Sequence, residues 1–74
     1  MNLQQLRAVR ETSHQDFNLT QVAATLHTTQ PAVSRQIREL EQELGVEIFA
    51  RRGKRLTGHT SAGREIAVIV ERTA

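Results

Sequence analysis

The sequence has no cysteine, tryptophan or tyrosine, and only two of its 74 residues are phenylalanine. Without cysteine, the chain forms neither disulfides nor a thiolate zinc site. A chain of this length with 38% hydrophobic residues makes one domain with a small core and little room for a large catalytic pocket. Long apolar runs are also missing, because the longest covers only residues 66–70 and is too short to span a membrane.

Signals for export, metal binding and catalysis are missing as well. No charged and then apolar leader opens the chain, so we expect a cytoplasmic protein. The three histidines, His14, His27 and His59, lie in separate segments without a carboxylate cluster beside them, which argues against a zinc site. Ser34 has no histidine and carboxylate partners nearby in the sequence. We therefore expect no enzyme, no metal and no cofactor.

The net charge of +2 is unevenly distributed. Residues 51–55 read Arg-Arg-Gly-Lys-Arg, which places four basic residues in one short segment. Residues 30–50 instead carry two arginines against four glutamates. A local basic cluster favours a nucleic-acid partner, although by itself it is equally consistent with a solvated turn.

Apolar periodicity predicts two helices in the first part of the chain. Leu3, Leu6 and Val9 recur every three residues over residues 2–13, and Asn2 is a suitable N-cap. A second, short helix is predicted from Asn18 to about residue 26, followed by a turn at residues 27–28. Its inward face comprises Leu19, Val22, Ala23 and Leu26.

A third helix is predicted from the N-cap Thr29 to Gly45, with Pro31 in its first turn. Its buried stripe comprises Val33, Ile37, Leu40 and Leu44. Pro31, Arg35 and Arg38 lie roughly opposite that stripe. The carboxylates Glu39, Glu41 and Glu43 follow toward the other end, where they stay away from a polyanion bound at the helix start.

After Gly45, the spacing of the apolar residues is no longer helical and predicts a hairpin. Val46, Ile48 and Leu56 predict short strands, with a bend at residues 52–54 and Phe49 as the anchor on the core. Thr60 predicts the N-cap of a fourth helix, and the sequence stops inside that helical pattern. We therefore expect an N-terminal piece of a longer protein. Two helices joined by a tight turn and followed by a basic hairpin predict a mainly α winged helix-turn-helix fold, with a three-helix core and a C-terminal helix.

Six motifs, in order along nearly the whole chain, resemble the DNA-binding domain of LysR-type transcriptional regulators. They are Leu3-Gln4-Gln5-Leu6-Arg7, Thr28 to Ile37, Leu40-Glu41-x-Glu43-Leu44-Gly45, Phe49-x-Arg51, Leu56-Thr57 and Thr60-x-Ala62-Gly63. The opening motif, the residues around Asn18 and Arg51-x-Gly53-Lys54 most resemble the CysB branch, whose members control sulfur assimilation genes.

The resemblance implies a sequence-specific contact with double-stranded DNA. In the third helix, Gln30, Pro31, Ser34 and Arg35 match the residues that meet bases and nearby phosphates. The expected phosphate contacts of this region are Thr28, Thr29 and Arg38. In the hairpin, or wing, Lys54 matches the position at the minor groove, with Arg51, Arg52 and Arg55 beside it.

The resemblance also implies a division of the longer protein. Residues 1–59 match the DNA-binding domain, and residues 60–74 match the start of a linker helix that pairs two subunits on inverted half-sites. Ser61 stands where many members carry proline, which casts little doubt on the helix start. A C-terminal domain that binds a small effector is expected outside this chain. The apolar excess of the last helix predicts a homodimer interface at Ile66, Ile69, Val70 and Thr73.

Two other interpretations of the chain remain at this point. The first is a winged helix that serves as a protein-interaction module, whose third helix would tolerate loss of Ser34 and Arg35. The second is a DNA-binding winged helix of another regulator family with a different dimer arrangement.

Overall fold

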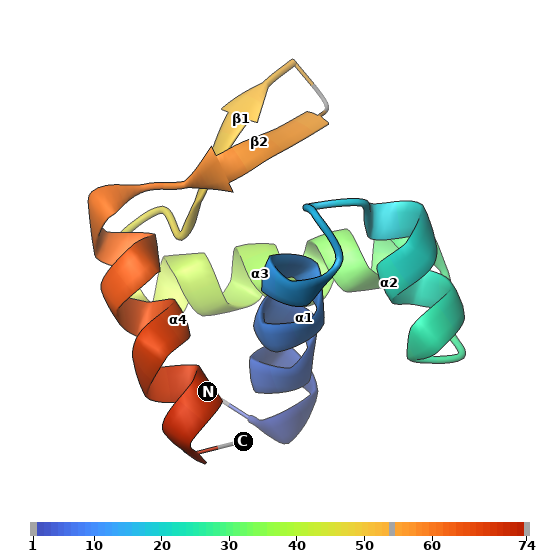
Figure 1. Cartoon of the computed structure of the whole chain (residues 1–74), viewed down its shortest axis with the longest axis horizontal. Helices are drawn as coiled ribbons and strands as arrows, with labels where there is room; N and C mark the ends of the chain where they lie inside the picture. Colours follow the sequence, from blue (N-terminus) through green and yellow to red (C-terminus); the bar gives the residue numbers. More distant parts are fainter. Residues whose placement is uncertain (1, 54, 74) are drawn as a thin grey trace.

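The computed structural model describes residues 2–53 and 55–73, the last of them by its backbone alone. Its elements follow the order α1 (Leu3–His14), α2 (Leu19–Thr25), α3 (Gln30–Leu44), β1 (Phe49–Arg52), β2 (Arg55–His59) and α4 (Ser61–Thr73). α3 crosses the molecule behind α1, the hairpin projects above them, and α4 descends beside α1 (Figure 1). The predicted mainly helical winged-helix fold is confirmed.

Local side-chain caps fix the helix starts where the sequence predicts them. The Asn2 side chain accepts a hydrogen bond from the Gln5 backbone N–H at 2.9 Å. The Gln5 side chain accepts in return from the Asn2 N–H at 3.2 Å. The side chains of Asn18 and Thr29 accept backbone N–H groups at the starts of α2 and α3, and Gly45 ends α3 with a left-handed φ of 73°. These boundaries are confirmed because each depends only on neighbouring residues.

The inward face of α1 differs from the predicted stripe. Leu3 is 54% exposed, whereas Ala8 and Val9 are buried. The polar residues Gln5 and Thr12 are also buried, because Gln5 is held in the cap and the Thr12 hydroxyl donates to the Ala8 carbonyl at 2.7 Å. The three-residue spacing therefore predicted the helix and, with Leu6 and Val9, part of its inward face, but it was wrong at Leu3.

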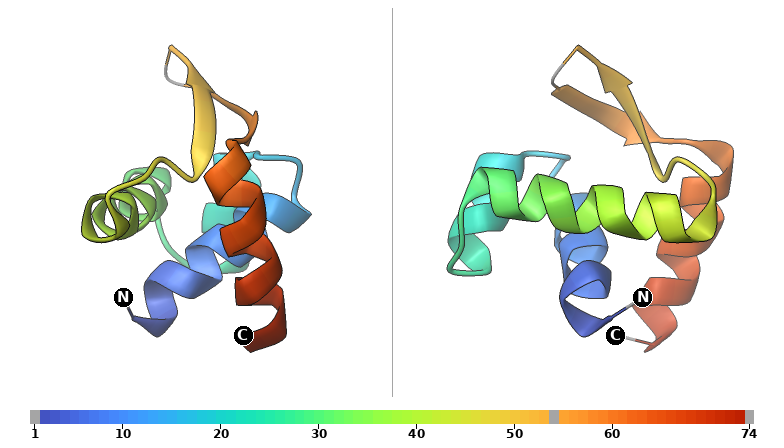
Figure 2. Two further views of the ribbon diagram at one scale, coloured as in Figure 1. Left: turned by 90° about the vertical axis from the view of Figure 1, so that its left-hand side faces the viewer. Right: turned by 180° about the vertical axis from the view of Figure 1, so that it is seen from behind.

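α3 forms the centre of the core, with Val33, Ile37 and Leu40 each at most 1% exposed. The prediction was wrong at the end of the stripe, where Leu44 is 37% exposed and the neighbouring Glu41 is buried instead. Seen from behind, α3 lies in front of α1, so the side of α3 that faces away from α1 is left uncovered (Figure 2). The arrangement therefore leaves one side of α3 at the surface.

The hairpin begins later than the sequence predicted. Val46 precedes the first strand and is 39% exposed, whereas Ile48 and Phe49 are fully buried. The antiparallel register pairs Phe49 with His59 and Arg52 with Arg55, and a bulge at Thr57 of β2 lies opposite the step from Ala50 to Arg51. Phe49 anchors the hairpin on the core, as predicted.

α4 turns one apolar edge inward and another outward. Val70 is 2% exposed and belongs to the core, and Ile66 packs against that core. Val68 and Ile69 are 50% and 61% exposed. The prediction of Val70 as a dimer contact is therefore wrong, because the domain's own core already covers this side chain. Among the described residues, no helix has the length and apolar character needed to cross a membrane.

Candidate nucleic-acid interface

A tight turn joins α2 to α3 and sets the start of α3. The Thr28 N–H donates to the Ala23 carbonyl at 2.9 Å, and the His27 N–H donates to the Ala24 carbonyl at 3.2 Å. His27 adopts a left-handed φ of 56°, which lets the chain reverse without a glycine. This confirms the turn that the sequence predicted at residues 27–28.

The predicted recognition residues lie together on the turn and the first half of α3. Ser34 is half-buried, and the others are exposed. The Thr20 hydroxyl of α2 donates to the Gln30 side-chain oxygen at 3.4 Å, which links the starts of the two helices. The exposed residues are Thr28, Thr29, Gln30, Pro31, Arg35 and Arg38. They offer hydroxyl, amide, apolar and guanidinium groups on one surface, which is the mixture that base edges and phosphates require.

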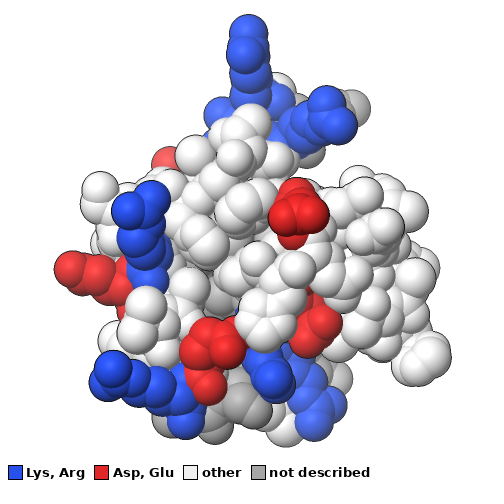
Figure 3. All heavy atoms as spheres, in the orientation of Figure 1, with Lys and Arg blue, Asp and Glu red and all other residues white. Residues whose placement is uncertain are grey.

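The tip of the hairpin carries a second exposed basic group. Arg52 and Arg55 face each other across the turn, where Gly53 takes a left-handed φ of 64°. Arginine side chains gather on this projecting part of the surface (Figure 3). Lys54, predicted as the minor-groove residue, lies outside the described residues, as does the side chain of Thr73.

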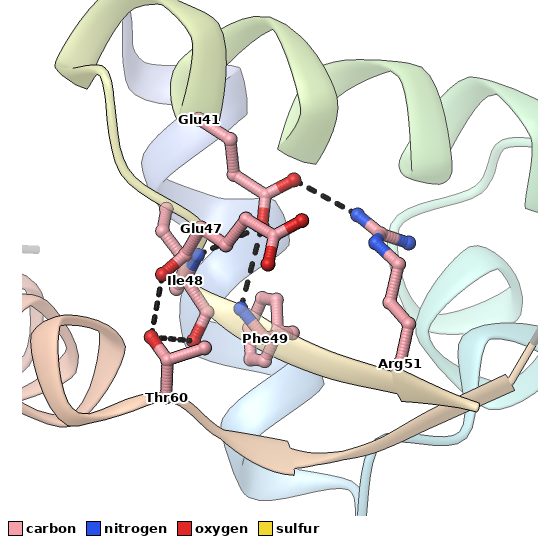
Figure 4. Close-up of polar contacts among 6 residues, drawn as sticks. All are labelled: Glu41, Glu47, Ile48, Phe49, Arg51 and Thr60. Atoms are coloured by element: carbon pink, nitrogen blue, oxygen red, sulfur yellow. Dashed lines mark hydrogen bonds and ion pairs between the residues drawn. The ribbon is translucent and has the colours of Figure 1, made fainter.

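Arg51 has a different environment from its neighbours in the basic cluster. Its Nη2 donates to Glu41 Oε1 at 2.8 Å, and its side chain is only 22% exposed. The same carboxylate accepts the backbone N–H groups of Ile48 at 2.8 Å and Phe49 at 3.3 Å (Figure 4). The ion pair therefore turns Arg51 back toward α3. The sequence analysis missed this role of Glu41 and counted it among the acids kept away from phosphate.

The far side of the hairpin base is tied to α4. The Thr60 hydroxyl lies within hydrogen-bond distance of the carbonyls of Glu47 and Ile48 (Figure 4). It also accepts the Gly63 N–H at 2.9 Å, which confirms Thr60 as the N-cap of α4. One side chain thus joins the start of α4 to the segment that enters β1.

An aromatic cluster, formed by Phe17, Phe49 and His59, completes the base of the hairpin. The His59 ring centroid lies 5.1 Å from that of Phe17 and 5.4 Å from that of Phe49. His59 Nε2 lies 2.9 Å from the Ser13 hydroxyl oxygen of α1. Burial lowers the pKa of His59 below 6.5, and the nearby positive charge of Arg64 lowers it further. Through these contacts, His59 helps to hold the wing against α1.

Arg7 is a basic residue near the recognition surface that the sequence analysis did not select. It lines a hollow of about 400 Å³ between α1 and α3, together with Arg35, Gln4 and Gln36. Among the described residues that line this hollow, none is acidic. The sequence carried no signal for it, because Arg7 lies outside the helix-turn-helix and meets Arg35 only after folding. Over residues 2–53 and 55–73, no group of three or more metal-ligating side chains comes together.

Residues 3–64 match the bacterial regulatory helix-turn-helix protein family named lysR. The chain belongs to the LysR family. Because the match covers both helices of the helix-turn-helix and the whole hairpin, it assigns the described surface to the DNA-binding domain of a LysR-type transcriptional regulator. It also agrees with the expectation that the chain is not an enzyme.

Curated LysR-type relatives cover almost the entire chain. The regulator cbl of Escherichia coli strain K12 is 61% identical over 72 residues, which span 97% of this chain and 23% of the relative. SsuR and CysB of Burkholderia cenocepacia are each 58% identical over the same shares. The chain thus spans about a quarter of the length of these relatives. It is close to the CysB, Cbl and SsuR regulators, as the motifs predicted.

Solved structures of the LysR family share the fold. The BenM_DBD/benA site 1 DNA complex has a TM-score of 0.87 and 29% identity, over 97% of this chain and 79% of that one. The CbnR_DBD-DNA complex has the same TM-score and identity, over 97% and 80%. Both neighbours are LysR-type DNA-binding domains bound to DNA.

Proposed function

We propose that the first half of α3 enters the major groove of double-stranded DNA while the wing lies at the minor groove or along the backbone. The observation that carries this proposal is the common exposure of the α3 start and the basic wing tip, which project from one rigid core. The exposed acids Glu39 and Glu43 lie nearer the other end of α3. A polyanion at the start of α3 and at the wing therefore meets mainly neutral and basic groups.

The side chains of the candidate site suit different roles within this interface. The planar guanidinium of Arg35 suits O6 and N7 of a guanine, and the ring of Pro31 suits a thymine methyl. Gln30 and Ser34 offer hydrogen bonds to base edges or nearby phosphates. Thr28, Thr29 and Arg38 are suited to phosphates, as are Arg52 and Arg55 in the wing. Lys54 keeps the expected place at the minor groove.

Substitution Arg35→Ala tests the recognition role. We expect a loss of about 1–3 kcal/mol in binding and relaxed preference at one base position. The measurement is selection of binding sites from random DNA, followed by affinities for the selected and scrambled duplexes. Arg72→Ala is a matched control, because it removes an equally charged, exposed side chain from the end of α4. Unchanged discrimination with Arg35→Ala, or binding that is weak and purely salt-driven in the wild type, would favour a protein-interaction module.

We further propose that the chain pairs with a second copy through the outer face of α4. Val68 and Ile69 present adjacent apolar side chains there, whereas Val70 lies in the core. A pair of domains related by a two-fold axis would read two inverted half-sites about one helical turn, or a multiple of it, apart.

Substitution Ile69→Glu tests this pairing, because it places a charge on the proposed interface. We expect the dimer to dissociate at concentrations where the wild type sediments as a dimer. Leu3→Glu is the control, since Leu3 is a similarly exposed apolar residue on α1. A wild type that stays monomeric at high concentration, or an Ile69→Glu variant that sediments like the Leu3→Glu control, would contradict the pairing.

The similarity to CysB, Cbl and SsuR favours the control of sulfur assimilation genes by the whole protein. Because the chain spans 23% of these relatives, we assign the binding of a small effector to the region that corresponds to the rest of their length.

A further inference from the structure

A buried carboxylate lies at the junction of α3 and the wing. Glu41 is 8% exposed, and it is the only acidic side chain among the buried residues that the structure describes. Burial of a charge is costly unless hydrogen bonds and an opposite charge compensate for it. The contacts of Glu41 therefore indicate what this carboxylate holds in place.

Both oxygens of Glu41 are directed at the segment that forms the base of the wing. Oε2 accepts from two consecutive backbone N–H groups, at Ile48 and Phe49, which orients the chain as it enters β1. Oε1 accepts from the guanidinium of Arg51, two residues further along. One carboxylate on α3 thus fixes both the direction of β1 and the orientation of the Arg51 side chain (Figure 4).

The register of the hairpin shifts beside Arg51. Ala50 pairs with Gly58 and Arg51 with Leu56, so the extra residue of the bulge is Thr57 on β2, opposite the step from Ala50 to Arg51. A bulge increases the local twist of the strand pair, and successive side chains of a strand point to opposite faces. Arg51 turns back to Glu41, whereas the next residue, Arg52, is exposed at the tip. Adjacent arginines therefore differ in direction, one toward α3 and one toward solvent.

We propose that Glu41 and Arg51 are positioning residues that hold the wing at a fixed angle to α3, so that the wing tip and the α3 start reach the same DNA together. This inference rests on the proposed function and replaces the DNA contact predicted for Arg51. Glu41 touches no DNA in this arrangement. It acts through the placement of the basic tip, of which Arg55 is a described member.

A double-mutant cycle between Glu41 and Arg55 tests the inference. The affinity of the 74-residue chain for a duplex that it selects from random DNA is measured for wild type, Glu41→Ala, Arg55→Gln and the double variant, at several salt concentrations. Arg55→Gln alone should weaken binding. It should also lower the salt slope, which is the steepness with which the logarithm of the affinity falls with the logarithm of the salt concentration, by about 1. With Glu41→Ala present, the wing is no longer held in place, so the added effect of Arg55→Gln should fall below about twofold.

A purely structural role of Glu41 predicts a different result. The two substitutions would then act independently among folded molecules, and Arg55→Gln would keep its full effect in both backgrounds. That result would overturn the inference. Glu39→Ala is the matched control, because it removes an exposed carboxylate from the same helix and should leave the Arg55 effect unchanged.

Arg51→Gln keeps the inference testable if Glu41→Ala does not fold at the assay temperature. This variant leaves the two backbone hydrogen bonds of Glu41 in place, and folding is checked by circular dichroism. It should also reduce the effect of Arg55→Gln, whereas full additivity would overturn the inference. A failure of the proposed function can be distinguished from a failure of this inference, because an Arg35→Ala variant would then keep its base discrimination.

Discussion

The base and the tip of the wing contain the same kind of residue in opposite environments. At the base, Arg51 is 22% exposed and ion-pairs with the buried Glu41. At the tip, Arg52 and Arg55 are exposed on either side of the turn. All three belong to one basic pentapeptide in the sequence. A count of charges in a motif therefore overstates the charge that is available to a polyanion.

The difference extends to the way each region is stabilised. The base is packed and hydrogen-bonded to three helices, through Glu41 of α3, Ser13 of α1 and Thr60 at the start of α4. In the part of the tip that the structure describes, the stabilising contacts are the cross-strand pairing and the turn at Gly53. We therefore expect substitutions at the base to change folding, and substitutions at the tip to change DNA binding alone.

The largest effect on stability is expected from Gly63→Ala, where α4 meets the base. A Cβ at this position would lie 1.7 Å from the Ile48 carbonyl oxygen, and backbone atoms cannot move aside as a flexible side chain can. We expect the free energy of unfolding to fall by about 3 kcal/mol. Urea denaturation monitored by circular dichroism measures this change.

Gly58→Ala is the control for Gly63→Ala. A Cβ at Gly58 would meet no atom within 4 Å, so the free energy of unfolding should change by less than about 0.5 kcal/mol. If both variants unfold at the same urea concentration, the close approach of α4 to Ile48 does not exist in solution.

A smaller effect is expected from acid, through His59 at the base. Because the pKa of His59 is lowered in the folded state, the unfolded chain binds a proton first as the pH falls below 6.5. Stability should therefore decrease from that pH downward, until the pH passes the lowered pKa and His59 is protonated in both states. Thermal unfolding at a series of pH values measures the decrease.

His59→Gln removes the ionisable ring and serves as the comparison. Its unfolding temperature should depend less on pH over this range than that of the wild type. Equal pH dependence of the two proteins would show that the aromatic cluster does not disfavour protonation of His59.

The sequence predicted the features that depend on neighbouring residues. Asn2, Asn18 and Thr29 cap helices through backbone groups two or three residues away, and Gly45 and Gly53 take a left-handed φ at the end of α3 and in the hairpin turn. The fold class followed from these boundaries together with the apolar spacing. The family motifs then indicated which exposed residues of α3 and the wing form the candidate site.

Features that depend on contacts between elements were not predictable in the same way. Ser13 and His59 lie 46 positions apart, and their contact requires the hairpin to return to α1. The Glu41 carboxylate reaches Arg51 only because β1 folds back along α3. Helical spacing likewise identified an apolar α4, but it could not decide that Val70 faces the core while Ile69 faces outward.

The smallest effects on stability, and the sharpest contrast with the base, are expected at the wing tip. Arg52→Gln and Arg55→Gln should each change the free energy of unfolding by less than about 0.5 kcal/mol, because neither side chain is buried. Each should lower the salt slope of DNA binding by about 1 and weaken selected and scrambled duplexes alike.

Arg51→Gln should show the opposite pattern in the same assays, because it leaves the buried Glu41 without its charged partner. Its unfolding free energy should fall, whereas any change in DNA affinity should come from wing placement rather than from a lost phosphate contact. Equal losses of stability at all three arginines would remove the distinction between base and tip. The opposite outcome is that Arg51→Gln keeps full stability and lowers the salt dependence of binding by about 1, both in the wild type and in the Arg55→Gln variant. Arg51 would then be a phosphate contact, and the basic pentapeptide would act as a single group.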